Sequence, residues 1–381
     1  MGSMLAKLPG ALPEKGPWVV LGMMSGTSAD GVDLSAVEID PMGFGSGRPF
    51  SKLLAHHHAS YPPELRQDVL AAASNVGDPA RLCVLQRRIG EHHARTAAEW
   101  RAGSALRPHF AALHGQTVQH HPREGATLQL ADPYLLAEAL DCPVVWDLRR
   151  RDLAVGGQGA PLVPLTELWL RGRQSDWVAL NLGGIANVTT WNGDSLQAWD
   201  TGPGMSLLDI AAQRWLGLPY DPEGSHASGS ADEAIVARWL EHPHFQTAPP
   251  KSTGREVFGA EWMRMESSGL DRLPIGARLA SLTAFTAEAV SRELRRWGRT
   301  LPEGTAFLVS GGGARHARLF DELTRRLAAF QLQRDQEFPS GAREAISWAL
   351  LGAASALGLP GNLPEVTGAA KPVSLGSWVF P

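Results

Sequence analysis

Residues 18–40, WVVLGMMSGTSADGVDLSAVEID, contain two apolar stretches separated by a turn of small and polar residues. The first stretch, residues 18–21, is apolar throughout, and the second alternates apolar and polar residues from Val32 to Ile39. Alternation with a period of two is typical of a β-strand that has one buried face. The segment therefore predicts a strand, a tight turn and a returning strand.

The turn at residues 25–31, SGTSADG, has the composition of an anion-binding loop. Its glycines and hydroxyl residues allow backbone N–H and side-chain O–H groups to converge on one point, as a nucleotide polyphosphate requires. Asp30 and Asp33 add carboxylates of the kind that hold Mg²⁺. The same residues would also suit an ordinary hairpin turn, and they match neither the GxxxxGK[ST] loop nor the GxGxxG fingerprint. The turn alone leaves both interpretations open.

A similar pattern recurs in the second half of the chain. Residues 177–184, WVALNLGG, are similar to the first strand and its turn, and residues 187–191 form a second predicted returning strand. A third glycine turn, at residues 311–313, follows an apolar stretch at residues 307–309. Two strand–turn–strand units predict an internal duplication, with one unit in each of two lobes and their loops facing each other across a cleft.

A carboxylate precedes another glycine turn. Residues 196–199 form a predicted strand, and Asp200 follows it directly, before the residues TGPG at 201–204. A carboxylate at a strand end is open to a ligand and can accept a proton as a general base. The alternative is an Asx-turn residue that only holds the backbone of the following turn.

Length and charge favour two domains and a small polar ligand. The chain has 381 residues, enough for two apolar cores. Its 35 basic and 39 acidic residues leave a net charge of −4, which gives no general attraction to nucleic acids or anionic membranes. The two cysteines, Cys83 and Cys142, indicate a reducing compartment. Because we find neither a signal-peptide core nor an apolar run long enough to span a membrane, we expect a cytoplasmic protein.

Apolar periodicity predicts the remaining elements. Helices are expected at residues 61–74, 79–102, 276–297, 317–330 and 342–357. A short buried strand at residues 110–113 is expected to end at the sequence HGQT, at the sheet edge where α/β proteins collect ligands. The predicted first lobe comprises residues 1–147 with 343–381, and the second comprises residues 148–342.

Arginines and histidines suggest further binding groups. Three arginines at residues 149–151 precede the glycine-rich residues 155–161, and they are either a solvated face or bidentate donors to a sugar or carboxylate. The clustered histidines at residues 56–58 and 92–93 lack the spacing of a zinc site. We expect His114 to orient the polar turn that follows it.

These motifs together resemble the anhydro-N-acetylmuramic acid kinase family, which belongs to the sugar kinase, actin and heat-shock chaperone ATPase superfamily. The resemblance extends from Trp18 through the chain. It is carried by MMSGTSADGVD, HGQTV, TLQL, RRRDLAVGGQGAPLVP, LNLGGIANVT, DTGPG, PKSTGRE and SGGGA. It implies an α/β, two-lobed actin-like ATPase fold, that is a duplicated ribonuclease H-like fold, with a central ligand cleft.

The resemblance also implies an activity. Members of this family use ATP with Mg²⁺. They open the 1,6-anhydro bridge of anhydro-N-acetylmuramic acid by hydrolysis and phosphorylate O6. The products are N-acetylmuramic acid 6-phosphate and ADP, and the pathway is peptidoglycan recycling.

Residue roles follow from the motif match. Asp200 takes the position of the catalytic base, Arg151 and Glu344 take positions that contact the sugar, and Asp30 is the expected metal ligand. His114 and Gln116 are further substrate-binding candidates. The ATP-binding candidates are Gly26, Thr27, Ser28, Ala29, Asp30, Gly31, Val32, Asp33, Gly183, Gly184, Gly311, Gly312 and Gly313.

Three positions depart from the family pattern. Met205 and His316 stand where the family usually has Asn, and Asp147-Leu148-Arg149 replaces Asp-Phe-Arg. Two other functions remain as alternatives, an ordinary acetamido-sugar or hexose kinase and an actin-like ATP-driven conformational protein. We expect ATP and a small sugar as partners, with no nucleic acid and no membrane. The oligomeric state is open, with a homodimer as one alternative.

Overall fold

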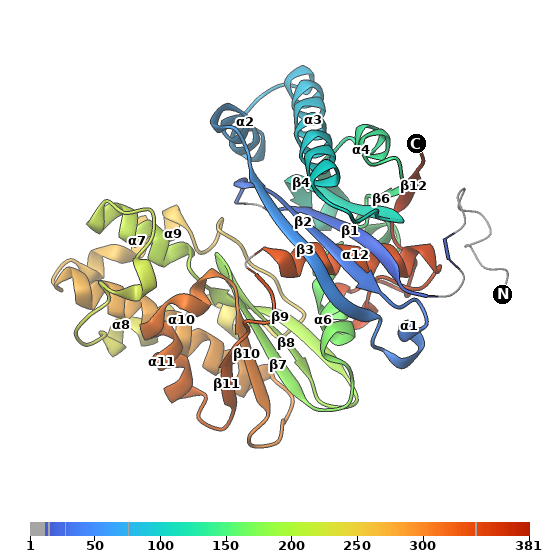
Figure 1. The fold of residues 1–381 in the computed structure, drawn as a ribbon. Coiled ribbons are helices and arrows are strands. Elements are labelled where there is room, and N and C mark those ends of the chain that lie inside the picture. Colours follow the sequence, from blue (N-terminus) through green and yellow to red (C-terminus); the bar gives the residue numbers. More distant parts are fainter. Residues whose placement is uncertain (1–11, 14–15, 27, 75, 340) are drawn as a thin grey trace. The chain divides into compact units, whose positions relative to one another are not determined.

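A computed structural model describes residues 12–13, 16–26, 28–74, 76–339 and 341–381, and it has an α/β fold with two sheets (Figure 1). The chain forms two compact units. The first comprises Met1–Gly172 with Phe338–Pro381, and the second comprises Arg173–Glu337. Thr27, one of the predicted ATP-binding residues, lies outside the described residues.

The observed division differs from the expected boundaries at residues 147 and 343. Residues 148–172 belong to the first unit because Leu165 and Trp169 share an apolar core with its C-terminal helix. Phe338 likewise lies in the first unit, where its ring contacts that of Phe50 edge-on at 5.5 Å between centroids. Apolar packing therefore places the first crossing after the glycine-rich segment at residues 155–161 and the second a few residues before the expected position.

A seven-stranded sheet organises the first unit. The strand order is β12-β6-β4-β1-β2-β3, and β5 pairs with β4. Its strands are β1 (Trp18–Ser25), β2 (Gly31–Ile39), β3 (Phe50–Ser60), β4 (Phe110–His121), β5 (Ala126–Leu130), β6 (Val144–Trp146) and β12 (Ser377–Val379). β2 is antiparallel to β1 and β3, whereas β1, β4 and β6 are parallel. The carboxyl ends of these three parallel strands therefore lie along one edge of the sheet.

Helices cover both faces of this sheet (Figure 1). They are α1 (Gly43–Ser46), α2 (Pro63–Ala73), α3 (Pro79–Gly103), α4 (Pro133–Leu140), α5 (Arg150–Leu153), α6 (Val163–Arg171), α12 (Ala342–Ala356) and α13 (Pro364–Thr367). Side chains of β1 alternate between the faces: Val20 shares a core with α12, and Leu21 shares another with α4. The structure confirms the two strands predicted within residues 18–40 and the helix predicted at residues 342–357.

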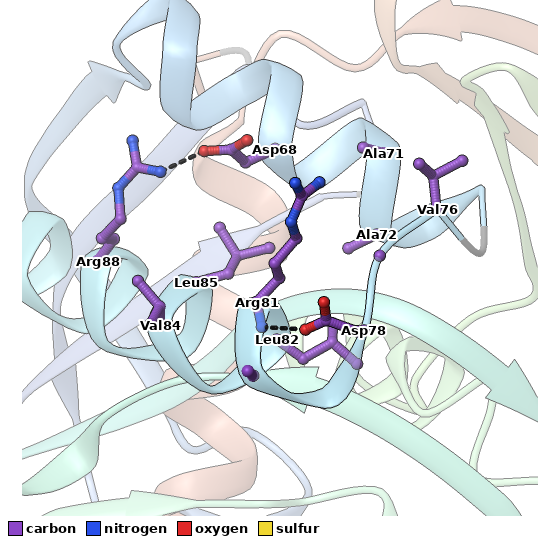
Figure 2. Close-up of a pocket in the computed structure, with 12 residues that line it drawn as sticks. Asp68, Ala71, Ala72, Val76, Asp78, Arg81, Leu82, Val84, Leu85 and Arg88 are labelled. Carbon is purple, nitrogen blue, oxygen red and sulfur yellow. Dashed lines mark hydrogen bonds and ion pairs between the residues drawn. The ribbon is translucent and has the colours of Figure 1, made fainter.

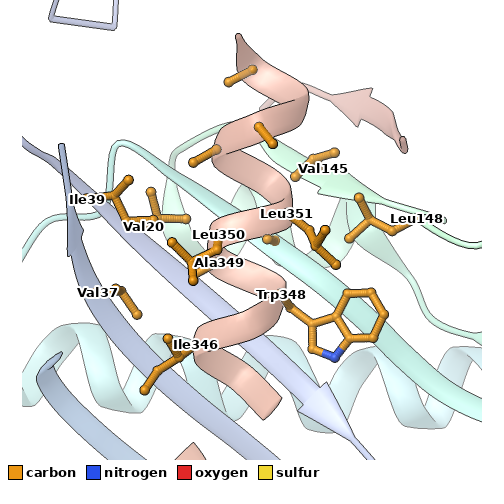
Figure 3. Packing of buried hydrophobic residues seen from close by; sticks show 14 of the residues in the cluster. Val20, Val37, Ile39, Val145, Leu148, Ile346, Trp348, Ala349, Leu350 and Leu351 are labelled. Carbon is orange, nitrogen blue, oxygen red and sulfur yellow. The ribbon is translucent and has the colours of Figure 1, made fainter. Parts of the chain in front are cut away.

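The C-terminal helix α12 packs directly on the first sheet. Figure 3 shows its Leu351 directed toward Val145 and Leu148. Gly22 of β1 makes this approach feasible, since a Cβ atom at that position would collide with the backbone carbonyl of Ala345. Any side chain at residue 22 would therefore push the helix away from the strand.

The second unit repeats the strand order of the first. Its sheet has the order β11-β10-β7-β8-β9. The strands are β7 (Trp177–Leu182), β8 (Ile185–Trp191), β9 (Leu196–Pro203), β10 (Ala306–Ser310) and β11 (Gln331–Arg334). β7 and β8 are antiparallel and β7 and β10 are parallel, as are the equivalent pairs of the first unit. The predicted duplication is confirmed at the level of topology.

α-Helices also form part of the second unit. They are α7 (Ser206–Leu216), α8 (Glu233–Trp239), α9 (Ala260–Glu266), α10 (Ile275–Trp297) and α11 (Ala317–Arg326). The predicted helix at residues 276–297 is confirmed, whereas α11 ends earlier than expected. No helix among the described residues is long and apolar enough to cross a membrane.

One prediction about the first sheet is wrong. β4 does not end at residue 113 but continues to His121, because it pairs with β5 in a hairpin. The sequence HGQT therefore lies within a strand, although Gly115, with φ of +79°, interrupts its regular course. Register shifts in β1 and β4 accompany this irregularity and bring Gln116 opposite Ser25.

Candidate functional site

The predicted phosphate turn begins where β1 ends. Ala29 has φ of +52°, and its N–H donates to the carbonyl of Gly26 at 3.1 Å, which closes the turn. The Ser28 hydroxyl donates to Oδ1 of Asp30 at 2.9 Å. Gly31 and Val32 already belong to β2. The turn thus exposes Asp30 and the Ser28 hydroxyl.

Gln116 supports this turn and is not open to a ligand. Its side chain is buried, and Nε2 donates to the carbonyl of Gly26 at 2.9 Å. The structure gives Gln116 a positioning role at this turn, and its contact with substrate stays a prediction. The irregular β4 register brings the amide to this point.

A buried polar network beneath the turn was not predicted from the sequence. The Tyr61 hydroxyl donates to Ser25 Oγ at 3.0 Å, and Nε2 of His93 lies 3.1 Å from both oxygens. Burial lowers the pKa of His93 to about 3, so this imidazole is neutral at physiological pH. The network fixes Ser25, the last residue of β1, without adding charge beneath the turn.

The carboxylates near the turn fit a hard divalent cation. Asp30 is exposed, and its charge acts on Asp33, whose pKa is raised by burial and lowered by His58 and His56. His58 Nδ1 lies 3.1 Å from Asp33 Oδ1. Within the described part of the chain, no cluster of three or more His, Cys, Asp or Glu side chains forms a metal cage. Mg²⁺ commonly takes only one or two carboxylates together with phosphates and water, and Asp30 is the exposed carboxylate of this turn.

Arg149, and not Arg151, is the arginine held at the carboxyl edge of the first sheet. Its Nε donates to Nε2 of His114 at 3.0 Å, and Nη1 donates to the carbonyl of Gly159 at 2.9 Å. The guanidinium carbon lies 5.1 Å from the ring centre of Trp348. Arg151, which the motif match favoured, is exposed on α5.

His114 holds Arg149 and is itself buried. Its Nδ1 lies 2.7 Å from the carbonyl of Gly115, so Nδ1 carries the proton and Nε2 accepts from Arg149. Burial and the neighbouring guanidinium lower the pKa of His114 well below its usual value. His114 thus orients the arginine, and its contact with substrate stays a prediction.

Glu344, in the first turn of α12, interacts electrostatically with this arginine. Burial raises the pKa of Glu344, Arg149 lowers it, and Asp33 and Asp30 raise it. Burial lowers the pKa of Arg149 to about 10, and Glu344 opposes that shift. The first unit therefore combines one cation and three carboxylates around the strand ends, an arrangement suited to a polar ligand with hydroxyl and acid groups.

Asp152 explains why the glycine-rich segment after the arginines is ordered. Its buried carboxylate accepts from Gly159 N–H at 2.7 Å, from Asn362 Nδ2 at 2.6 Å and from the Thr367 hydroxyl at 2.8 Å. These bonds fix the Gly159 carbonyl that holds Arg149. The acidic member of the RRRD motif is therefore structural.

In the second unit, the Gly183–Gly184 turn is attached to the start of α7. The carbonyl of Gly183 accepts from Met205 N–H at 2.8 Å, and that of Gly184 accepts from Gly204 and Ser206 N–H groups at 3.0 Å each. The carbonyl of Gly183 and the N–H of Gly184 belong to the same trans peptide, so they point in opposite directions. The Gly184 N–H therefore points away from α7 and is oriented to serve as a donor.

The third glycine turn is required by close packing. A Cβ atom on Gly311 would lie 2.7 Å from Oδ1 of Asn181, and one on Gly313 would lie 2.7 Å from Sδ of Met205. Gly312 has open space around it. Packing thus accounts for two of the three glycines, and Gly312 is the one free to approach a ligand.

Met205 and His316, which depart from the family pattern, both fit the fold. Met205 packs against two apolar cores of the second unit. His316 caps α11, since its Nδ1 accepts from Leu319 N–H at 3.1 Å. An Asn side chain commonly caps a helix in the same way, so the substitution retains that function.

Asp200 lies inside β9 and not beyond its end. It pairs with Asn187 of β8, where the register shifts between residues 186 and 187. Its Oδ2 accepts from Thr253 N–H at 2.8 Å, and its backbone carbonyl lies 3.0 Å from Nε2 of His244. Contacts to both its side chain and its backbone carbonyl therefore fix the position of Asp200.

The environment of Asp200 makes it a stronger base than a solvated carboxylate. Burial raises its pKa to about 6, the Thr253 N–H lowers it, the Glu256 charge raises it and the Lys251 charge lowers it. The carboxylate is therefore still ionised at neutral pH. A pKa closer to the working pH favours proton acceptance in the transition state.

A separate pocket lies between α2 and α3 in the first unit (Figure 2). Ala72, Leu82 and Leu85 contribute its apolar part, and an ion pair between Arg88 and Asp68 crosses one side. The predicted site residues are not among those that line it. We therefore do not assign the pocket to the reaction.

The chain repeats one strand order in its two units and matches the model of a kinase family. The model of the anhydro-N-acetylmuramic acid kinase family matches residues 18–381, and the chain belongs to this family.

Relatives of known name support this assignment. The chain is 41% identical to the anhydro-N-acetylmuramic acid kinase of Synechococcus sp. strain CC9605 over 380 residues, which covers 95% of this chain and 99% of that protein. It is 40% identical to that of Streptomyces avermitilis, covering 94% and 93%. Among solved structures, a ROK family glucokinase from Streptomyces griseus in complex with glucose and AMPPNP aligns with a TM-score of 0.39 and 13% identity, covering 87% of this chain and 98% of that chain.

Proposed function

We propose that this protein uses ATP to open the 1,6-anhydro bridge of anhydro-N-acetylmuramic acid and to phosphorylate O6, giving N-acetylmuramic acid 6-phosphate and ADP. The observation that carries the mechanism is the half-buried Asp200, with a pKa raised to about 6 and a carboxylate oriented by Thr253 N–H. Family membership supports the substrate. We also propose a cytoplasmic location and no nucleic acid or membrane partner.

In this mechanism Asp200 accepts a proton from water. The water oxygen forms a bond to C1 of the sugar as the bond between C1 and O6 breaks. O6 then takes the γ-phosphoryl group, and ADP leaves. Attack from the face opposite O6 inverts C1, as in glycosidases whose base activates water.

The first unit supplies binding groups in this proposal. The Gly26–Asp30 turn would contact ATP phosphates, and Asp30 would hold Mg²⁺, which neutralises phosphate charge when bound. Arg149, supported by His114 and Gly159, would donate to the sugar or its acid group. Glu344 would accept from a sugar hydroxyl.

Isotope labelling distinguishes hydrolytic opening from simple phosphorylation. Turnover in ¹⁸O-labelled water should place the label on C1 of the product and leave the phosphate unlabelled, because the water attacks carbon. Mass spectrometry of the product and of its dephosphorylated form locates the label. Label only in the phosphate, or ADP release with no dependence on the anhydro sugar, would contradict the proposal.

Asp30→Asn should lower Mg²⁺-dependent turnover by roughly 10²-fold, because the amide cannot supply a charged oxygen to the cation. Titration of activity with Mg²⁺ should show a higher half-saturating concentration. The fold should persist, since Asp30 is exposed. Asp141→Asn is the matched control, as this exposed aspartate lies at the end of α4 and can keep its left-handed backbone as Asn. Unfolding of Asp30→Asn with normal residual specific activity would show a structural role instead.

A further inference from the structure

Residues 251–256, KSTGRE, have no role so far beyond holding Asp200, yet they contact the phosphate turn of the second unit as well. Thr253 N–H donates to Asp200. Arg255 follows Thr253 by two residues and lies close to Gly184. A Cβ atom built on Gly184 would lie 3.1 Å from Nε of Arg255 and 3.2 Å from its Nη2. The segment therefore connects the proposed base with the Gly183–Gly184 turn.

The segment is anchored at its beginning by a buried ion pair. Nζ of Lys251 lies 2.8 Å from Oε2 of Glu293, and the two side chains are 4% and 0% exposed. The Lys251 carbonyl accepts from Asp200 N–H at 3.2 Å. Removal of either charge would leave the other buried without its counterion, which is costly.

The other end is fixed by the apolar core. Phe258 is fully buried, and its carbonyl accepts from the Ser206 hydroxyl at 2.8 Å. Ser206 is the first residue of α7, whose N–H also bonds to Gly184. Because both ends are held, the backbone between them sets the position of Arg255 relative to the turn.

Arg255 itself is exposed, and its charge acts on a carboxyl of the same unit. The neighbouring carboxyl is that of Asp209 in α7, whose pKa burial raises to about 6 and Arg255 lowers. A phosphate group carries more negative charge than this single carboxylate. The planar guanidinium also matches two phosphate oxygens at once.

We propose that Arg255 is a further catalytic residue, whose guanidinium binds the phosphoryl group being transferred beside the Gly183–Gly184 turn. The inference rests on the proposed kinase function. The bond between the γ-phosphorus and its bridging oxygen to ADP breaks, and the bond between O6 and that phosphorus forms. Arg255 stays protonated throughout and donates hydrogen bonds to charge that develops on the phosphoryl oxygens.

The experiment compares Arg255→Ala, Arg255→Lys and Asp209→Asn with the control Arg264→Ala. Arg264 is an exposed arginine of the same unit, with a side chain 72% exposed. Arg255→Ala should lower kcat by about 10²-fold, the scale of one lost transition-state donor, while ADP affinity stays within about threefold. Arg255→Lys should restore only part of kcat, because a lysine cannot bind bidentately. Asp209→Asn and Arg264→Ala should keep kcat near that of the wild type.

Nucleotide binding without sugar separates this inference from the proposed function. Calorimetry should show that the wild type binds a non-hydrolysable ATP analogue more tightly than ADP, and that both Arg255 variants lose this preference. If the wild type fails to turn over the anhydro sugar, the proposed function fails, and the binding preference still tests Arg255. Unchanged kcat in Arg255→Ala would overturn the inference. An equal loss in Asp209→Asn would also overturn it, since it would show a structural Arg255–Asp209 pair. If Arg255→Ala does not fold, a folded Arg255→Lys that keeps the full ATP preference and kcat would overturn it.

Discussion

Asp200→Asn is expected to lower kcat by roughly 10²- to 10⁴-fold, the range for loss of a general base. The amide keeps the shape of the carboxylate and can still accept from Thr253 N–H, but it cannot take a proton from water. Binding of ATP should change little, because the substitution removes no phosphate contact. Steady-state kinetics together with calorimetric titration of ATP would measure both effects. An active Asp200→Asn protein would exclude the proposed base.

The pH dependence of the wild type provides a second test of the same residue. Burial raises the pKa of Asp200 to about 6, so log(kcat/KM) should fall with a slope approaching one below that pH. The small residual activity of Asp200→Asn should lack this inflection. A wild-type inflection near pH 4 would instead indicate a solvated carboxylate.

Stability should change in the opposite direction from activity. The folded pKa of Asp200 lies above the ~3.9 of an unfolded aspartate, so ionisation opposes folding above about pH 6. This unfavourable contribution disappears as pH falls from 6 toward 4. Asp200→Asn should therefore raise Tm by a few degrees at pH 7.5, about 2–4 °C, and the difference should shrink toward pH 4. A lower Tm at pH 7.5 would show that the ionised carboxylate stabilises the fold.

The sequence predicted the strand–turn–strand units because their signal is local. Alternating apolar residues and glycine turns predict β1, β2, β7 and β8, and the structure confirms all four strands. β1 continues to Ser25, beyond the expected break at Gly22, and β8 begins at Ile185, two residues earlier than expected. The length of β4 was not predictable in this way. Its extension to His121 depends on pairing with β5, a contact that exists only once the hairpin forms.

The sequence identified the residue types of the candidate site, but it did not predict their burial or their pKa values. Asp200 was expected to be exposed with an ordinary pKa, yet the strand β9 runs through it and the segment near Thr253 covers it. Such burial depends on residues more than 50 positions away in the chain. The three consecutive arginines could not be distinguished by sequence alone. Arg149 is held by the Gly159 carbonyl, and Gly159 is held by Asp152, which accepts hydrogen bonds from Asn362 and Thr367 near the C-terminus.

Arg149→Ala is expected to lower kcat/KM for the anhydro sugar by roughly 10²-fold, because a hydrogen bond to a charged group contributes about 1.5–3 kcal/mol. The guanidinium is held by His114 and Gly159, stacks near Trp348 and interacts with Glu344. Its loss would therefore remove a preorganised donor and also leave the Glu344 carboxylate without its cation.

Arg149→Lys should recover little of this loss, because a lysine cannot bond to His114 and Gly159 from one planar group while also reaching a ligand. Arg151→Ala is the matched control, because it removes an arginine of the same motif that is exposed on α5. Its kcat/KM should stay within about twofold of the wild type, as expected for a surface substitution. Kinetics with the sugar as the varied substrate, alongside melting curves for all three variants, would measure these effects. The opposite ranking, with Arg151→Ala impaired and Arg149→Ala active, would restore the assignment that the motif match alone suggested.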